Sequence, residues 1–181
     1  GAENRGADEV WQRIRGESAI TAARGRVRRV CLEPEDAPAY PDAIRAILEA
    51  DLIVAGPGSL FTSVLPNLLV RDLSSAIASA WGRKVYVCNV ATEAGETQGY
   101  DVNAHVHALR QHVGPDLFRT ILANHTFIGP APPGTGVQWV RPPEHESRNY
   151  QLVMRDLVDR QYPWRHDPAK LAQALLELIN A

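Results

Sequence analysis

The sequence predicts an α/β fold with a mostly parallel sheet, and two kinds of observation support this. Residues 52–55 form an apolar run without polar alternation, as in a strand covered on both faces, and residues 85–90 and 120–123 are two further short strands. Segments with helical spacing of apolar residues separate them. Such alternation is typical of parallel strands joined by crossover helices. We therefore expect a three-layer, Rossmann-like arrangement, with residues 1–181 as a single domain.

Local patterns predict the elements that precede the first of these strands. Residues 9–20 are interpreted as a short strand pair, or as a strand followed by a loop. Residues 26–33 alternate charged and apolar side chains, which predicts a half-exposed strand. A helix is expected over residues 41–50, because a proline stands at its start and apolar residues recur there at helical spacing.

Helices are also expected between and after the strands. Residues 65–80 have a helical pattern that is broken near Pro66 and is clearest from residue 72. The helix expected over 101–113 can open on Asp101, and Asp167 directly precedes the helix expected over 168–179; each carboxylate can accept from free N–H groups of the first turn.

The remaining segment is rich in proline and glycine. Residues 129–147 predict a flexible linker or flap, with a possible strand at 137–140. Residues 150–154 are strand-like, and the strand can continue to residue 158.

The composition excludes several classes of protein. The net charge of −2 gives no electrostatic basis for binding nucleic acid or a membrane surface. No apolar run approaches the ~20 residues of a membrane span, and no signal peptide is visible, so we expect a cytoplasmic protein. Cys31 and Cys88 lie in apolar strand-like runs and are interpreted as buried thiols.

A glycine-rich turn follows the first buried strand and is the leading candidate for a ligand site. There the backbone can approach a ligand closely, and free N–H groups are available for an anion. The same residues can equally form an ordinary turn with helix caps. The candidates in this segment are Gly56, Pro57, Gly58, Ser59, Thr62, Ser63 and Asn67.

Further candidates come from two other polar segments. Loops 56–63, 89–97 and 124–126 follow strands, and ligands of parallel sheets bind beyond the carboxyl ends of the strands. Arg165 precedes the last helix, where it can pair with a phosphate or simply lie on the surface. The loop residues can also serve only to stabilise turns. The candidates of the second loop are Asn89, Thr92, Gly95, Glu96 and Thr97.

No catalytic residue and no metal site emerge from the sequence. His105 and His107 stand two residues apart on a helix and do not share a face, and nothing has the spacing of a zinc site or of a Ser-His-Asp triad.

Several segments resemble one known family, the YvcK-like gluconeogenesis factors, which are relatives of the CofD 2-phospho-L-lactate transferases. Residues 51–70 resemble the family's Gly-Pro-Gly-Ser-Leu-Tyr-Thr-Ser-Val-Ile-Pro-Asn-Leu-Leu core, with Phe61 in place of tyrosine. Residues 26–34 and 85–100 resemble two further conserved runs, and residues 165–168 resemble the closing Arg-His-Asp-Pro. The family's glycine-rich first strand has no counterpart here, so the chain resembles the C-terminal portion, and we expect a sheet incomplete on its N-terminal side.

The resemblance implies a cytoplasmic regulatory protein that binds a nucleotide sugar of the UDP-sugar type and is linked to cell shape and carbon metabolism. It implies no certain cofactor. The alternative is a transferase that uses a divalent metal to move a phospholactyl-type group from a nucleotide-activated donor. The Gly58-Ser59-Leu60 form of the loop fits the regulatory branch better. A third alternative is a structural oligomerisation module, and a homo-oligomer is expected in any case because the sheet edge would be open.

Overall fold

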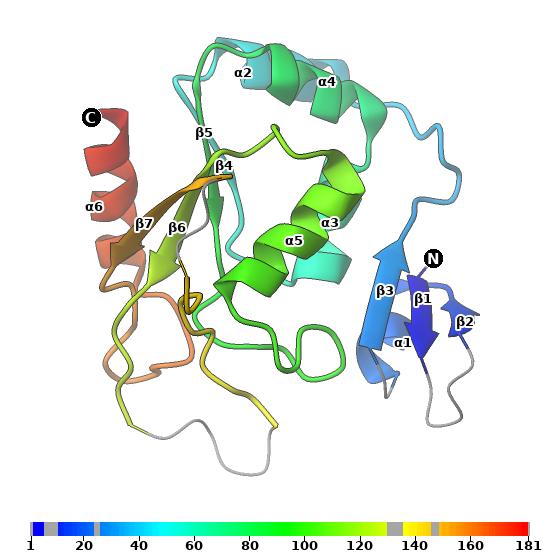
Figure 1. Ribbon diagram of the computed structural model, residues 1–181. Coiled ribbons are helices and arrows are strands. Elements are labelled where there is room, and N and C mark those ends of the chain that lie inside the picture. The colour runs from blue at the N-terminus through cyan, green and yellow to red at the C-terminus, as the bar shows by residue number, and fades with distance from the viewer. Residues whose placement is uncertain (1, 6–10, 24–25, 130–135, 146–148, 181) are drawn as a thin grey trace.

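A four-stranded parallel sheet forms the centre of the computed structural model, which describes residues 2–5, 11–23, 26–129, 136–145 and 149–180 (Figure 1). All of its strand pairs are parallel. The sequence prediction of an α/β fold with a parallel sheet is thereby confirmed. In their order across the sheet, the strands are β4 (Leu52–Ala55), β5 (Arg83–Val87), β6 (Thr120–Asn124) and β7 (Gln151–Arg155).

Helices cover both faces of this sheet and give three layers. The last helix, α6 (Pro168–Ile179), packs against one face through Leu171, Ala174 and Leu178. The other face lies beneath η1 (Leu60–Val64), a single turn of π-helix, with α3 (Leu65–Leu68) and α5 (Val102–Val113). Alternate strand residues therefore serve two separate clusters, which explains why these strands show no polar alternation.

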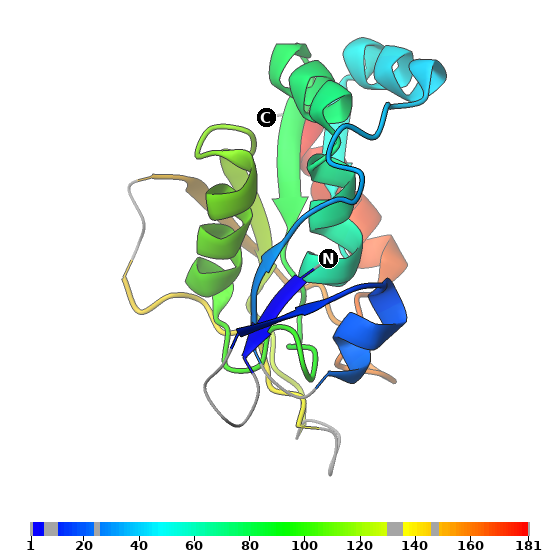
Figure 2. The ribbon, with the colours of Figure 1, turned by 90° about the vertical axis from the view of Figure 1, so that its right-hand side faces the viewer.

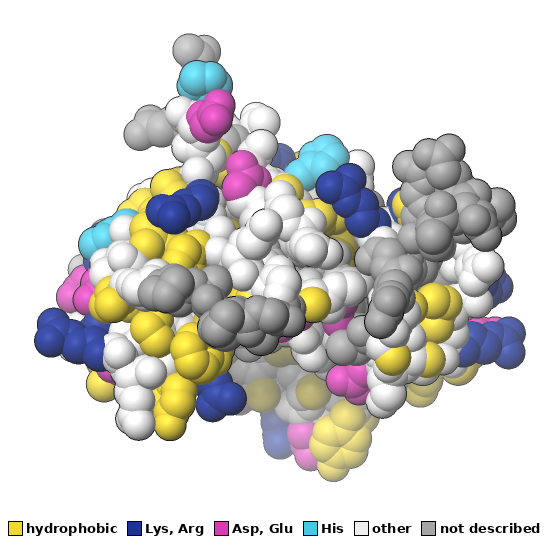
Figure 3. Space-filling model, turned by 90° about the horizontal axis from the view of Figure 1, so that it is seen from below, with side chains coloured by type: hydrophobic (Ala, Val, Ile, Leu, Met, Phe, Trp, Pro, Cys, Tyr) yellow, Lys and Arg dark blue, Asp and Glu magenta, His cyan; other side chains and the backbone are white. Residues whose placement is uncertain are grey.

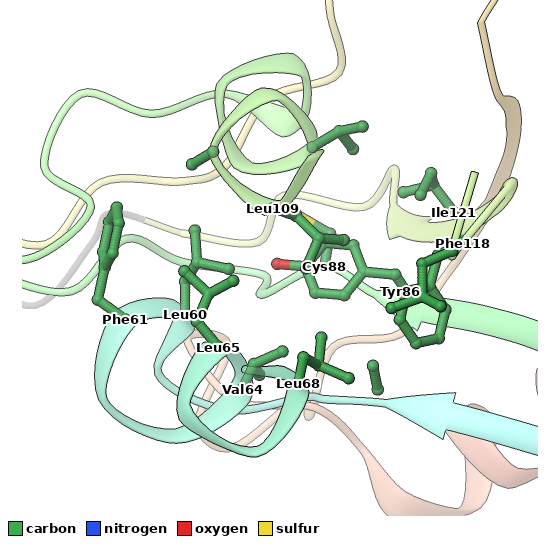
Figure 4. Packing of buried hydrophobic residues seen from close by; sticks show 14 of the residues in the cluster. Leu60, Phe61, Val64, Leu65, Leu68, Tyr86, Cys88, Leu109, Phe118 and Ile121 are labelled. Atoms are coloured by element: carbon green, nitrogen blue, oxygen red, sulfur yellow. The ribbon is translucent and has the colours of Figure 1, made fainter. Parts of the chain in front are cut away.

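The larger cluster is centred on Tyr86 of β5. Its ring lies among Leu60 and Leu65 on one side and Leu109 of α5 on the other (Figure 4). Cys88 is completely buried nearby, and this burial raises the pKa of its thiol far above the ordinary value. The thiol therefore stays protonated and unreactive, as expected for a small buried cysteine.

The N-terminal residues form a second, antiparallel sheet in the order β2-β1-β3. Its strands are β1 (Ala2–Arg5), β2 (Trp11–Ile14) and β3 (Arg26–Val30), and the sheet lies beside the carboxyl end of the parallel sheet (Figure 2). In β3, Val27 and Val30 are buried while the arginines are exposed, which confirms the half-exposed strand. The prediction of only strand and loop over 9–20 was wrong, because Glu17–Ala22 form helix α1, whose Ile20 packs into the core.

His112 of α5 holds the antiparallel sheet against the rest of the molecule. Its Nε2 accepts a hydrogen bond from the Val30 backbone N–H at 3.1 Å, and its Nδ1 lies 2.7 Å from the Ala108 carbonyl oxygen. Only a neutral imidazole can accept and donate in this way. Burial lowers the pKa of His112, which favours that neutral form.

The helix expected over 65–80 is interrupted at a different place from the one predicted. Pro66 lies in the first turn of α3, where its missing N–H costs no helical bond. The break comes at Val70, whose backbone is extended, and α4 (Arg71–Ser79) follows. Helix α2 (Pro41–Glu49) packs on α4 and begins at the predicted proline.

The region between β6 and α6 contains little regular structure. Trp139 forms an isolated bridge with Ala91. Strand β7 ends at Arg155, and Val158 forms only an isolated bridge with His166, so the predicted continuation of the strand to residue 158 was wrong. Two parts of the segment expected to be a linker, residues 130–135 and 146–147, lie outside the described residues.

Strand β4 lies at one edge of the parallel sheet. Within the described part of the chain it pairs only with β5, and Val54 is 37% exposed. A groove of about 390 Å³ runs along this edge and is lined mainly by apolar side chains from β4, α2, α3 and α4, including Ile47, Ile53, Leu73 and Ile77. An unpaired edge beside apolar surface favours pairing with another strand.

We predict that this edge mediates association between copies of the chain. Val54→Lys places a charge on the edge and should weaken self-association by roughly tenfold or more, about 1.4 kcal/mol. Val54→Thr, which keeps a β-branched side chain without charge, is the matched control and should associate like the unchanged protein. Sedimentation velocity over a concentration series measures this, and a chain that stays monomeric at high concentration would contradict the prediction.

Candidate functional site

Two loops meet at the carboxyl edge of the sheet because β4 and β5 run in parallel. The Asn89 side chain joins them by two hydrogen bonds to one residue. Its Oδ1 accepts from the Gly58 backbone N–H at 3.1 Å, and its Nδ2 donates to the Gly58 carbonyl oxygen at 3.1 Å. The predicted convergence of loops 56–63 and 89–97 at this edge is therefore confirmed.

A second set of hydrogen bonds fixes the loop that follows β5. The Thr62 hydroxyl donates to Glu96 Oε1 at 2.9 Å, which links this loop to η1. Within the loop, the Thr97 hydroxyl accepts from the Glu93 backbone N–H at 2.9 Å. The Thr92 hydroxyl accepts from the Gln138 N–H at 2.9 Å, which ties the loop to the segment after the linker. The loop therefore has a defined shape.

A cavity of about 660 Å³ lies between these loops. Its third side is formed by Trp164, Arg165 and His166, which precede α6. Seen from this side, basic and acidic side chains are scattered over a surface that is otherwise hydrophobic or uncharged (Figure 3). Seven sequence candidates line the cavity: Pro57, Gly58, Ser59, Asn89, Thr92, Glu96 and Arg165.

The other candidates do not line the cavity. Thr62 and Thr97 hold the loops through the bonds given above, and Gly95 turns the chain with φ +82°. Ser63 and Asn67 line the groove beside β4, and the Asn67 Nδ2 donates to the Ser63 carbonyl at 2.8 Å. Gly56 also lies on that groove. The structure thus gives these residues supporting positions around the cavity.

Seven residues of the cavity were not among the sequence candidates. Four are small or apolar, and the three with larger aromatic or titratable side chains are Glu93, Trp164 and His166. Trp164 and His166 flank Arg165 in the sequence, so the rim position inferred for Arg165 could have been extended to them. Glu93 stands in the same loop as Thr92 and Glu96, but its burial depends on contacts between loops that the sequence does not display.

Glu93 occupies an unusual electrostatic position. Burial raises the pKa of its carboxyl, the Ser59 hydroxyl donates to it and opposes this, and the neighbouring Glu96 raises it further. Its Oε2 is buried and has no hydrogen-bond partner in the described structure. A carboxyl group in such surroundings binds a proton more readily than one in water.

His166 is neutral in this site. Burial lowers the pKa of its imidazole, and one ring nitrogen hydrogen-bonds the Cys88 backbone. Because Nε2 is buried without a partner among the described residues, the nitrogen bonded to Cys88 is Nδ1. The ring therefore presents Nε2 as an acceptor.

His105 belongs to the core. It is completely buried, its Nδ1 lies 2.8 Å from the Asp101 carbonyl oxygen, and its ring contacts Tyr100 edge-on at 5.4 Å between centroids. Across the described residues, no three His, Cys, Asp or Glu side chains are grouped to hold a metal ion. A search of the same residues finds no helix with the length and apolar character needed to cross a bilayer.

Gly56 lies where the chain leaves β4, and its backbone approaches the end of β5 closely. Its φ is +84°, and a Cβ placed there would lie 2.7 Å from the Val87 carbonyl oxygen. Gly58 has a φ outside the left-handed region, and an added Cβ would lie 3.6 Å from the Ser63 Cβ, an ordinary contact. Position 56 therefore requires glycine more strictly than position 58 does.

We predict that Gly56→Ala lowers the free energy of unfolding by roughly 2–4 kcal/mol, because it combines a left-handed backbone with a clash against backbone. Gly58→Ala is the matched control and should change it by less than about 1 kcal/mol. Urea denaturation of the two variants, followed by circular dichroism, measures both. Equal losses for the two variants would show that the close approach at Val87 is unimportant.

Comparison with known proteins identifies similar chains. The family model described as 2-phospho-L-lactate transferase CofD matches residues 5–181. The gluconeogenesis factor of Bacillus subtilis is 38% identical over 174 residues, which cover 92% of this chain and 55% of that protein. The gluconeogenesis factor of Listeria innocua is 35% identical over 170 residues, which cover 92% of this chain and 53% of that protein.

A solved structure agrees with this relationship. The crystal structure of a protein member of the UPF0052 family from Bacillus halodurans matches with a TM-score of 0.82 and 34% sequence identity. The match covers 97% of this chain and 58% of that chain. This chain thus spans about half the length of these relatives.

Proposed function

Because the chain belongs to the 2-phospho-L-lactate transferase CofD family, we propose that its cavity binds a nucleotide sugar of the UDP-sugar type. We further propose that this binding serves a regulatory function of the gluconeogenesis-factor type, linked to carbon metabolism and cell shape in the cytoplasm. The relatives named gluconeogenesis factor support this branch of the family.

The observation that carries the proposal is the cavity between the two locked loops, with Arg165 beside it. Its volume of about 660 Å³ lies in the range of small-molecule sites. Pro57, Gly58 and Ser59 form one wall with little side-chain bulk, and Asn89 holds that wall in place. Arg165 can pair with a phosphate by charge-assisted hydrogen bonds, and the apolar faces of Val90, Val137 and Trp164 suit a base or sugar ring.

Family membership also supports a transferase alternative, in which a phospholactyl-type group moves from a nucleotide-activated donor with the help of a divalent metal. Glu93 and His166 are the titratable groups of the cavity that could transfer protons in such a reaction. Liquid chromatography of the chain incubated with Mg²⁺, such a donor and a deazaflavin acceptor tests this alternative. Formation of a phospholactyl product would favour the transferase over the regulator.

We predict that UDP-glucose binds the chain and that Arg165→Ala weakens this binding by roughly 10- to 100-fold, as expected for the loss of charge-assisted hydrogen bonds worth about 1.5–3 kcal/mol. Isothermal titration calorimetry measures the affinity. Arg119→Ala is the matched control, because Arg119 precedes β6 at the opposite end of the sheet, where its side chain forms an ion pair with Asp116. Absence of binding, or equal losses in the two variants, would overturn the proposal.

A further inference from the structure

The charges around the cavity are poorly matched to an anionic ligand if every carboxyl group is ionised. Among the described lining residues, Arg165 is the one permanent cation, whereas Glu93 and Glu96 are both acidic. A nucleotide diphosphate would bring further negative charge to the same space. Like charges in a partly dry site repel strongly, and each buried pair costs free energy unless one member is neutralised.

Of the two carboxyl groups, that of Glu93 is placed to be neutralised by a proton. The single hydrogen bond that its carboxyl accepts comes from the Ser59 hydroxyl, and it must reach Oε1, because Oε2 has no partner among the described residues. A proton can therefore be added to Oε2 without breaking a bond already made. Glu96 lies in the same loop, and its Oε1 accepts a hydrogen bond from the Thr62 hydroxyl, which ties this carboxyl to η1.

The other groups around Glu93 also favour a neutral carboxyl. His166 across the cavity is neutral, and Tyr86 and Cys88 of the underlying strand β5 are protonated, since burial raises the pKa of both. The hydrogen bond from the Ser59 hydroxyl opposes protonation of Glu93, and the positive charge of Arg165 in the same cavity would be paired with a bound phosphate. Burial and the adjacent Glu96 carboxylate already raise the pKa of Glu93 in the empty site.

We propose that Glu93 takes up one proton from solvent when an anionic nucleotide ligand enters the cavity, and that it contacts the ligand as a neutral hydrogen-bond donor. This inference rests on the proposed function and adds to it. Glu93 becomes a residue that positions the phosphates by donating to them, and the affinity of the site becomes linked to pH. A neutral carboxylic acid can make such a bond where a carboxylate would repel the ligand.

The sign of the linkage follows from the proton uptake. If the complex holds one more proton than the free components, affinity rises as pH falls. Above the pKa of Glu93 in the empty site, the dissociation constant should increase by about tenfold per pH unit, and it should level off below that pKa. The phosphates of UDP-glucose stay ionised throughout a pH range of 6 to 8.5, so the ligand does not contribute the proton.

Calorimetric titration with UDP-glucose tests this between pH 6 and 8.5, in EDTA, using pairs of buffers that differ in ionisation enthalpy. Phosphate buffer is avoided because it is itself an anion. For the unchanged chain we expect an uptake approaching one proton per ligand at alkaline pH. Glu93→Gln keeps a donor without a titratable proton, so its affinity should be independent of pH and close to the acidic limit of the unchanged chain.

Glu49→Gln is the matched control, since Glu49 is exposed at the end of α2, and it should keep the full pH dependence. Thermal melts establish that each variant is folded. Measurable binding with no proton uptake, or binding that releases protons, would overturn the role of Glu93. Absence of UDP-glucose binding at every pH would instead overturn the proposed function.

Discussion

The pairing of β4 with β5 depends on two glycines, one at each end of the pair. Before β5, a Cβ on Gly82 would lie 2.1 Å from the Ala50 carbonyl oxygen, which precedes β4. After β4, a Cβ on Gly56 would lie 2.7 Å from the Val87 carbonyl oxygen at the end of β5. Backbone approaches this close exclude any side chain. They set the register that brings Gly58 opposite Asn89, on which the shape of the cavity depends.

Most polar side chains of the two loops are used to hold the loops together. The amide of Asn89 has both its groups bonded to Gly58, and the hydroxyls of Thr62, Thr92 and Thr97 bond to groups of the protein. A ligand therefore meets a preformed wall, which lowers the entropy lost on binding. Among the described lining residues, Arg165, Glu93 and the Nε2 of His166 are side-chain groups placed to recognise it.

Local sequence signals predicted where helices begin and where the strands lie. They failed where contacts between residues distant in the sequence determine the structure. Asp101 and Asp167 cap α5 and α6 through bonds from Ala104 and Ala169, as a residue pattern alone can indicate. Helix α1 was missed because its described side chains are mostly exposed, and among them only Ile20 reaches the core. For the site, the loops and Arg165 could be predicted, whereas the burial of Glu93 arises from Ser59 and Glu96 meeting it across two loops.

The open edge of β4 and the cavity share part of their walls. Pro57 and Gly58 line both the groove along β4 and the cavity, and Ile53 and Ala55 continue the groove along the strand. A strand that paired with β4 would contact this turn directly, and any shift of Gly58 would reach Asn89 through its two hydrogen bonds. The association proposed at the sheet edge and the ligand binding proposed in the cavity would therefore act on the same turn. Since interfaces and packed loops respond to each other through such shared elements, the two processes are expected to be energetically coupled.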